Sequence, residues 1–183
     1  QKIWAREIAE LGKSAGRKSK TIEDKESSKW LQGITACNTL LGETIKTVHI
    51  ADREADIYEL FFLPALSNSE LLIRACQHRK TDDDNLLWEQ ISGLPLNATI
   101  VLQIPETTGH KKVDTVMEVR YQKVTILCPR NKKGKYDSVA LTAIEVKEQG
   151  KGDNTMCWRL LTSLDVECME DVKTYIRWYT YRW

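Results

Sequence analysis

The chain has 183 residues, of which 42% are hydrophobic and 29% charged, and this composition is typical of a folded globular protein. The formal net charge of +1 excludes an overall basic excess, so any surface for a polyanion has to be local. No apolar run approaches the ~20 residues that a helix needs to cross a bilayer, so no membrane contact is expected. The five cysteines form no Cys-x-x-Cys pair, which argues against a disulfide framework or a zinc cluster.

The first predicted helix lies in the segment EDKESSKWLQGITACNTLL. Its apolar side chains recur at helical spacing, at Trp30, Leu31, Ile34 and Cys37. Gly42 follows the last of these turns and is placed to end the helix. The pattern therefore predicts an amphipathic helix with a defined end.

Two strands and a second helix are predicted next. The segments KTVHIAD and ELLIRA are short and apolar, as buried strands are. Between them, ADIYELFFLPAL carries Ile57, Leu60 and Phe61 on one helical face and is expected to close near Pro64. Helix and strand thus alternate over residues 28–75, which indicates an α/β sheet with helices packed on it.

The pattern changes after this unit. A short helix is predicted in NLLWEQISGL, and four strands follow it, at Ala98–Ile104, Lys112–Tyr121, Lys123–Cys128 and Ser138–Glu148. In the second of these strands apolar and polar residues alternate, as they do when one face is solvated, and only Val116 interrupts the polar side. These strands predict an antiparallel β insertion.

The last segments return to the α/β pattern. MCWRLLTSL predicts a buried strand, and the final MEDVKTYIRWYTYRW has Val172, Tyr175, Ile176 and Tyr179 at the spacing of an amphipathic helix. The predicted organisation has three parts: a first part of the core at 1–92, an inserted β subdomain at 93–152, and a return to the core at 153–183, cut off in its last helix.

Asp52 stands directly after the apolar VHIA, within the stretch HIADREADIYELF. In open α/β sheets, functional groups gather just beyond the carboxyl ends of the strands. A carboxylate there suits Mg²⁺, which binds carboxylate oxygens, water and phosphate oxygens. Asp is also a preferred N-cap residue, so the same pattern fits a side chain that only caps a helix beginning near Arg53. The local sequence leaves both interpretations open.

Five segments occur in one order along the chain: DKESSKWL, DREADIYE, LLIRA, WRLLTS and YTYRW. Together they resemble the DDE transposases of bacterial insertion sequences, in the branch with a Tyr-x2-Arg-x3-Glu-x6-Lys signature. The resemblance extends over essentially the whole chain, although the inserted β region matches only in character. It implies an RNase H-like core, a mixed sheet flanked by helices, interrupted by the β subdomain.

The resemblance also implies a chemistry. In that family three carboxylates, Asp, Asp and Glu, hold two divalent ions, Mg²⁺ or Mn²⁺, for in-line attack on a DNA phosphodiester. Asp52 matches the second Asp, and so would be both catalytic residue and metal ligand. The first Asp is expected upstream of Gln1 and the Glu four residues after Arg182, past Trp183. The chain is therefore expected to be a piece of a longer protein and inactive by itself.

Other residues match positions that contact DNA in the family. Tyr179 and Arg182 match the Tyr and Arg of the signature, share one helix face, and would hold a DNA phosphate. Trp158 matches a Trp that lies against a flipped base. Arg74 matches an Arg that contacts the DNA end, and Arg79 lies in a small basic cluster after the same strand, suited to phosphates.

The resemblance implies double-stranded DNA as partner, both transposon ends and target, and a homodimer in the parent's synaptic complex. It also implies a cytoplasmic, nucleoid-associated location in bacteria. The alternative is a non-catalytic DNA-binding or interaction module with an α/β fold, in which Asp52 is only a helix cap. Without the wider resemblance, DREAD alone would fit a plain metal-free α/β domain.

Overall fold

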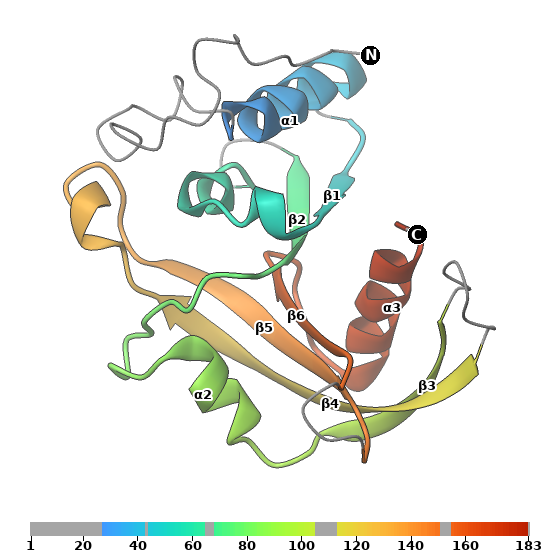
Figure 1. Ribbon diagram of the computed structural model, residues 1–183. Helices are drawn as coiled ribbons and strands as arrows, with labels where there is room; N and C mark the ends of the chain where they lie inside the picture. Colours follow the sequence, from blue (N-terminus) through green and yellow to red (C-terminus); the bar gives the residue numbers. More distant parts are fainter. Residues whose placement is uncertain (1–26, 43, 65–67, 105–112, 151–154, 183) are drawn as a thin grey trace, which may run out of the picture.

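The computed structural model describes residues 27–42, 44–64, 68–104, 113–150 and 155–182. The six described strands form one curled sheet in the order β1-β2-β6-β5-β4-β3 (Figure 1). They are β1 (Thr47–Ala51), β2 (Ser69–Arg74), β3 (Ala98–Ile104), β4 (Val113–Ile126), β5 (Val139–Glu148) and β6 (Cys157–Thr162). β1 and β2 are parallel, and every other neighbouring pair is antiparallel. The prediction of an α/β fold with a mixed sheet is confirmed.

Helices cover both faces of the sheet. The α-helices are α1 (Ser28–Leu41), α2 (Leu87–Ser92) and α3 (Met169–Thr180), and the 3₁₀ helices are Arg53–Ala55, Tyr58–Phe62 and Arg130–Lys132. Because side chains alternate along a strand, Leu71 and Ile73 of β2 join the apolar cluster beneath α1 and α2. Leu72 joins the cluster beneath α3, where Ile176 is fully buried. Two apolar layers, one on each face, therefore hold the sheet in place.

The predicted first helix is confirmed together with its end. Gly42 follows α1 with a φ of +69° and a ψ of −176°, a backbone conformation that is essentially restricted to glycine. Its amide donates a hydrogen bond to the carbonyl of Asn38, 3.0 Å away. The chain then turns into β1, the strand that leads to Asp52.

The prediction of one continuous helix from Ala55 to near Pro64 is wrong. The chain forms the 3₁₀ helices Arg53–Ala55 and Tyr58–Phe62, with Ile57 extended between them. The break follows from Asp56, whose buried carboxylate accepts hydrogen bonds from the amides of Cys76 and Gln77. These contacts hold Asp56 against the loop after β2, which a regular helix would not allow. Leu60 and Phe61 are nevertheless buried, as their spacing predicted.

The two strands predicted at 112–121 and 123–128 are one strand, β4. Its ladder with β5 continues unbroken from Met117 to Ile126. The pattern misleads because the buried face changes along the strand. Met117 and Val119 pack in the α3 cluster, whereas Val124 and Ile126 pack in the cluster beneath α1 and α2. Near Gln122 the alternation therefore changes phase although the strand does not end.

The strands of the predicted insertion, β3 to β5, belong to the same sheet as β1, β2 and β6, because β5 pairs with β6. The boundaries at 92 and 152 stay a prediction. Among the described segments, no helix has both the length and the apolar character that a membrane crossing requires.

Candidate functional site

The parallel pairing of β1 with β2 positions Asp52. Ala51 lies opposite Ile73 in the register, so the residues that follow, Asp52 and Arg74, emerge side by side at one edge of the sheet. The Asp52 carbonyl accepts the Ala55 amide at 2.8 Å and so starts the first 3₁₀ helix. The carboxylate itself makes no capping hydrogen bond. Asp52 therefore stands at the N-cap position of this 3₁₀ helix without a side-chain capping hydrogen bond.

Side chains from β2, from α3 and from the turn after α3 converge on the Asp52 carboxylate. Arg182 Nη1 lies 2.9 Å from Oδ2, which is hydrogen-bonding distance, and Arg74 Nη1 lies 3.9 Å from Oδ1. The Tyr179 hydroxyl donates a longer hydrogen bond of 3.4 Å to Oδ1. The structure thus brings together four of the six predicted site residues, although Tyr179 is 127 positions from Asp52 in the chain.

The electrostatics keep Asp52 ionised. Partial burial raises the pKa of this carboxyl, but the Arg53 backbone amide and the charges of Arg182 and Arg74 outweigh it, so the net shift of the pKa is downward. Burial raises the pKa of Tyr179, so its hydroxyl remains a proton donor. The Asp52 side chain is 28% exposed and the Arg182 side chain 31%, so both remain accessible to a ligand.

The residues present do not by themselves fit a divalent ion. Within the described part of the chain, no three His, Cys, Asp or Glu side chains lie close enough together to hold a metal. Asp52 contacts two guanidinium groups, and their charges would oppose a cation bound to this carboxylate. The two further carboxylates expected from the family are not among the described residues. The edge as described is suited to an anion.

Trp158 does not present a surface for a base. Its side chain is 4% exposed, and its ring packs edge-on against Tyr179 with the centroids 5.4 Å apart and the planes at 67°. It lies in the core beneath α3 and supports the tyrosine that contacts Asp52. The predicted base-stacking face is therefore not available in this structure.

Arg79 is held in an ion pair with Asp56, and its contact with DNA stays a prediction. Its side chain is 10% exposed and forms an ion pair with Asp56, which is fully buried. Its guanidinium also lies over the ring of Phe61, 5.3 Å from the centroid. The nearby Lys80, from the same basic cluster, pairs with Asp84.

A polar cavity of about 430 Å³ lies beside the Asp52 contacts. Four cations line it: Arg53, Arg74, Lys147 and Arg159. Only Arg74 was predicted as a site residue. Periodicity assigns residues to faces of a strand, but it does not give the register that places Arg159 opposite Glu145 and Lys147 opposite Cys157.

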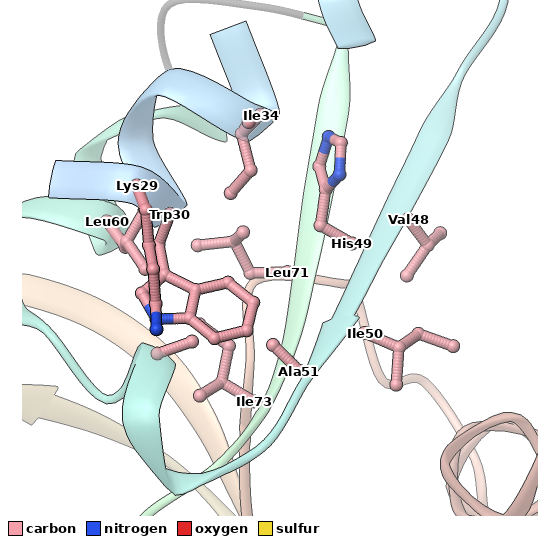
Figure 2. Close-up of a pocket in the computed structure, with 12 residues that line it drawn as sticks. Lys29, Trp30, Ile34, Val48, His49, Ile50, Ala51, Leu60, Leu71 and Ile73 are labelled. Atoms are coloured by element: carbon pink, nitrogen blue, oxygen red, sulfur yellow. The ribbon is translucent and has the colours of Figure 1, made fainter. Parts of the chain in front are cut away.

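A second cavity, of about 410 Å³, lies between α1 and β1 (Figure 2). Figure 2 shows the ring of Trp30 beside the Lys29 side chain, with Ile34 and His49 higher in the same space. His49 lies within 3.4 Å of both the Asn38 amide oxygen and the Thr47 hydroxyl. The lining is mostly apolar, and none of the predicted site residues contributes to it.

A comparison of the chain with models of known protein families finds no match.

Proposed function

We propose that this chain is a segment of the catalytic core of a DDE-type DNA transposase, with an RNase H-like fold and Asp52 as one of three catalytic carboxylates. One observation carries the proposal. Asp52, Tyr179 and Arg182, which match the family's second Asp and the start of its signature, meet at the mouth of a parallel strand pair. Nothing in local propensity requires Asp52 to lie beside Tyr179 and Arg182, since Tyr179 is 127 positions away in the chain.

In this proposal the arginines bind DNA phosphate. The planar fork of a guanidinium matches the geometry of phosphate oxygens, and Arg74 and Arg182 are held at one edge by Asp52. The partly buried position strengthens their attraction for an anion. The parent protein would bind double-stranded DNA as a homodimer. Two Mg²⁺ or Mn²⁺ ions would support cleavage there once the other two carboxylates are present, and this segment alone would not cleave.

Substitution of Asp52 in a protein that carries this chain with its flanking segments tests the proposal. We expect Asp52→Asn to abolish metal-dependent strand cleavage and to leave binding of the DNA ends nearly unchanged, because the amide cannot ligate a metal as a carboxylate does. Asp114→Asn is the matched control, since Asp114 is an exposed carboxylate on β4. Cleavage that persists in Asp52→Asn, or equal loss of cleavage and binding, would contradict the proposal.

A non-catalytic DNA-binding module is the second candidate function. It is favoured by the pairing of Asp52 with two arginines and by the absence of a three-acid cluster among the described residues. Under this alternative the carboxylate positions the arginines and has no role in chemistry. The flanked wild-type protein would then bind DNA but show no cleavage with either Mg²⁺ or Mn²⁺.

A further inference from the structure

The polar cavity beside Asp52 is built by residues from five parts of the chain. Arg74 stands at the end of β2, and the next amide, that of Ala75, donates a 2.7 Å hydrogen bond to the Arg159 carbonyl on β6. Arg159 lies opposite Glu145 of β5 in the sheet register. Arg53, from the 3₁₀ helix after Asp52, completes the cationic wall, and α2 contributes to the lining as well.

The charges in this cavity are strongly unbalanced. Four cationic side chains and one carboxylate line it, whereas the whole chain carries a net charge of only +1. That carboxylate, Glu145, is 2% exposed and already accepts hydrogen bonds from Ser92 Oγ at 2.7 Å and from Arg159 Nε at 3.3 Å. Glu145 therefore holds one arginine in place and does not cancel the remaining positive charge.

The thiols of the cavity add no negative charge. Burial raises the pKa of Cys157, and the nearby Glu145 carboxylate raises it further. Burial and the charge of Asp56 raise the pKa of Cys76 in the same direction. Both thiols are therefore protonated near neutral pH, and the cavity stays cationic.

The cations are suited to a ligand from solvent. The Arg159 guanidinium lies over the Trp88 ring, 5.4 Å from its centroid, which fixes its position. Lys147 and Arg53 are exposed, and neither forms an ion pair with the residues that the structure describes. Arg74 links the cavity to the Asp52 site, because it lines the cavity and also contacts the Asp52 carboxylate.

We propose that this cavity binds a phosphate group of the nucleic-acid strand that passes Asp52, with Arg53, Lys147 and Arg159 as ligands to which the family resemblance assigned no role. The identity of the phosphate as part of DNA rests on the proposed function. A phosphate group matches the cavity because it is anionic, accepts several hydrogen bonds and binds guanidinium groups in a fork geometry. Arg74 then connects the phosphate in the cavity with the one held near Asp52.

Cysteine protection locates the bound strand directly. Cys76 lines the cavity and Cys168 precedes α3 outside it, and both are exposed free thiols. The chain is alkylated with neutral iodoacetamide, with and without a short DNA duplex, and modification of each cysteine is followed by mass spectrometry. We expect DNA to slow alkylation of Cys76 and to leave Cys168 unchanged. Equal protection of both cysteines, or protection of neither, overturns the proposal.

A charge substitution tests the same site by a second measurement. We expect Lys147→Gln to weaken DNA binding. The slope of log affinity against log salt is negative, and its magnitude should decrease by about 0.9, the value for one phosphate contact. Lys123→Gln is the matched control, because Lys123 is also an exposed strand lysine but lines a different cavity. It should leave the slope unchanged, and equal changes in the two variants would overturn the proposal.

The two proposals fail in different ways. If the flanked protein cleaves DNA but Lys147→Gln behaves as wild type and Cys76 is not protected, the cavity assignment is wrong and the proposed function stands. If Cys76 is protected and the salt slope falls as expected but no metal-dependent cleavage occurs, the transposase assignment is wrong and the phosphate site stands. If the wild-type chain binds no DNA, the assignment of the cavity as a phosphate site is wrong.

Discussion

Replacement of Arg79 tests whether this residue stabilises the fold or binds DNA, the role that the sequence suggested. The Arg79 guanidinium pairs with the fully buried Asp56 carboxylate and also donates a 3.1 Å hydrogen bond to the Asp56 carbonyl. The other Asp56 oxygen accepts the amides of Cys76 and Gln77, each at 2.7 Å. Arg79→Met keeps most of the aliphatic stem but leaves a buried negative charge with only neutral hydrogen-bond donors.

The expected loss of stability is large. Removal of one partner from a buried ion pair typically costs about 3–5 kcal/mol, because the remaining charge is desolvated without compensation. Domains of this size are stable by about 5–15 kcal/mol, so the variant would lose a substantial part of the free energy of unfolding. At about 2–4 °C per kcal/mol, Tm should fall by about 6–20 °C. The double variant Asp56→Asn/Arg79→Met should recover part of this loss, since it removes the uncompensated charge.

Urea denaturation measures the change in the free energy of unfolding, and fluorescence anisotropy with a labelled duplex measures DNA affinity below the unfolding transition. Arg130→Met is the matched control, because Arg130 is exposed, and its effect on stability should stay within about 0.5 kcal/mol. If Arg79→Met unfolded at the wild-type urea midpoint but bound DNA more weakly, Arg79 would be a phosphate ligand and the structural assignment would be refuted.

Three further predictions concern stability. Burial lowers the pKa of His49 below its ordinary value of 6.5. As pH falls, the unfolded chain therefore takes up a proton before the folded chain does, and the fold loses stability. His49→Gln should show a smaller drop in Tm than the wild type between about pH 7.5 and about pH 5.5. Trp158→Ala should cost about 3–5 kcal/mol in urea denaturation, and a variant as stable as wild type would show that the ring is not part of the core. Gly42→Ala should destabilise the fold by about 1–3 kcal/mol because Gly42 has a positive φ. Gly33 lies inside α1 with no atom within 4 Å of an added methyl group, so Gly33→Ala should stabilise the fold by about 0.5–1 kcal/mol. Changes of the same sign in the two variants would contradict the backbone argument.

Local patterns were sufficient for the elements whose packing is local. Helical spacing and the glycine after it predicted α1, and the spacing of Val172 and Ile176 predicted α3, both of which the structure contains. The pattern failed where a distant contact overrides it. The helix expected from Ala55 to near Pro64 is interrupted by Asp56. Its partners lie in the loop after β2, and no periodicity within the segment encodes them.

The site shows the same division between local and distant information. The position of Asp52 could be predicted from an apolar strand followed by an acid, and the resemblance named the residues that reach it from α3. Neither source could indicate that Trp158 is buried or that the Arg79 side chain is largely covered, since burial depends on which elements pack over a residue. The cationic cavity was missed because Lys147 and Arg159 come from strands that are neighbours only in the folded sheet.

The balance of charge at this edge constrains the order in which ligands can bind. Asp52 is outnumbered by Arg74 and Arg182, and the adjoining cavity adds further cations, so the described edge attracts polyanions and opposes a free divalent ion. A metal would be favoured only after further carboxylates, or the phosphates of a bound strand, had offset the guanidinium groups. Under the proposed function, DNA binding and metal binding are therefore coupled. The phosphates that Arg74 and Arg182 hold would then supply the negative charge that a divalent ion needs beside Asp52.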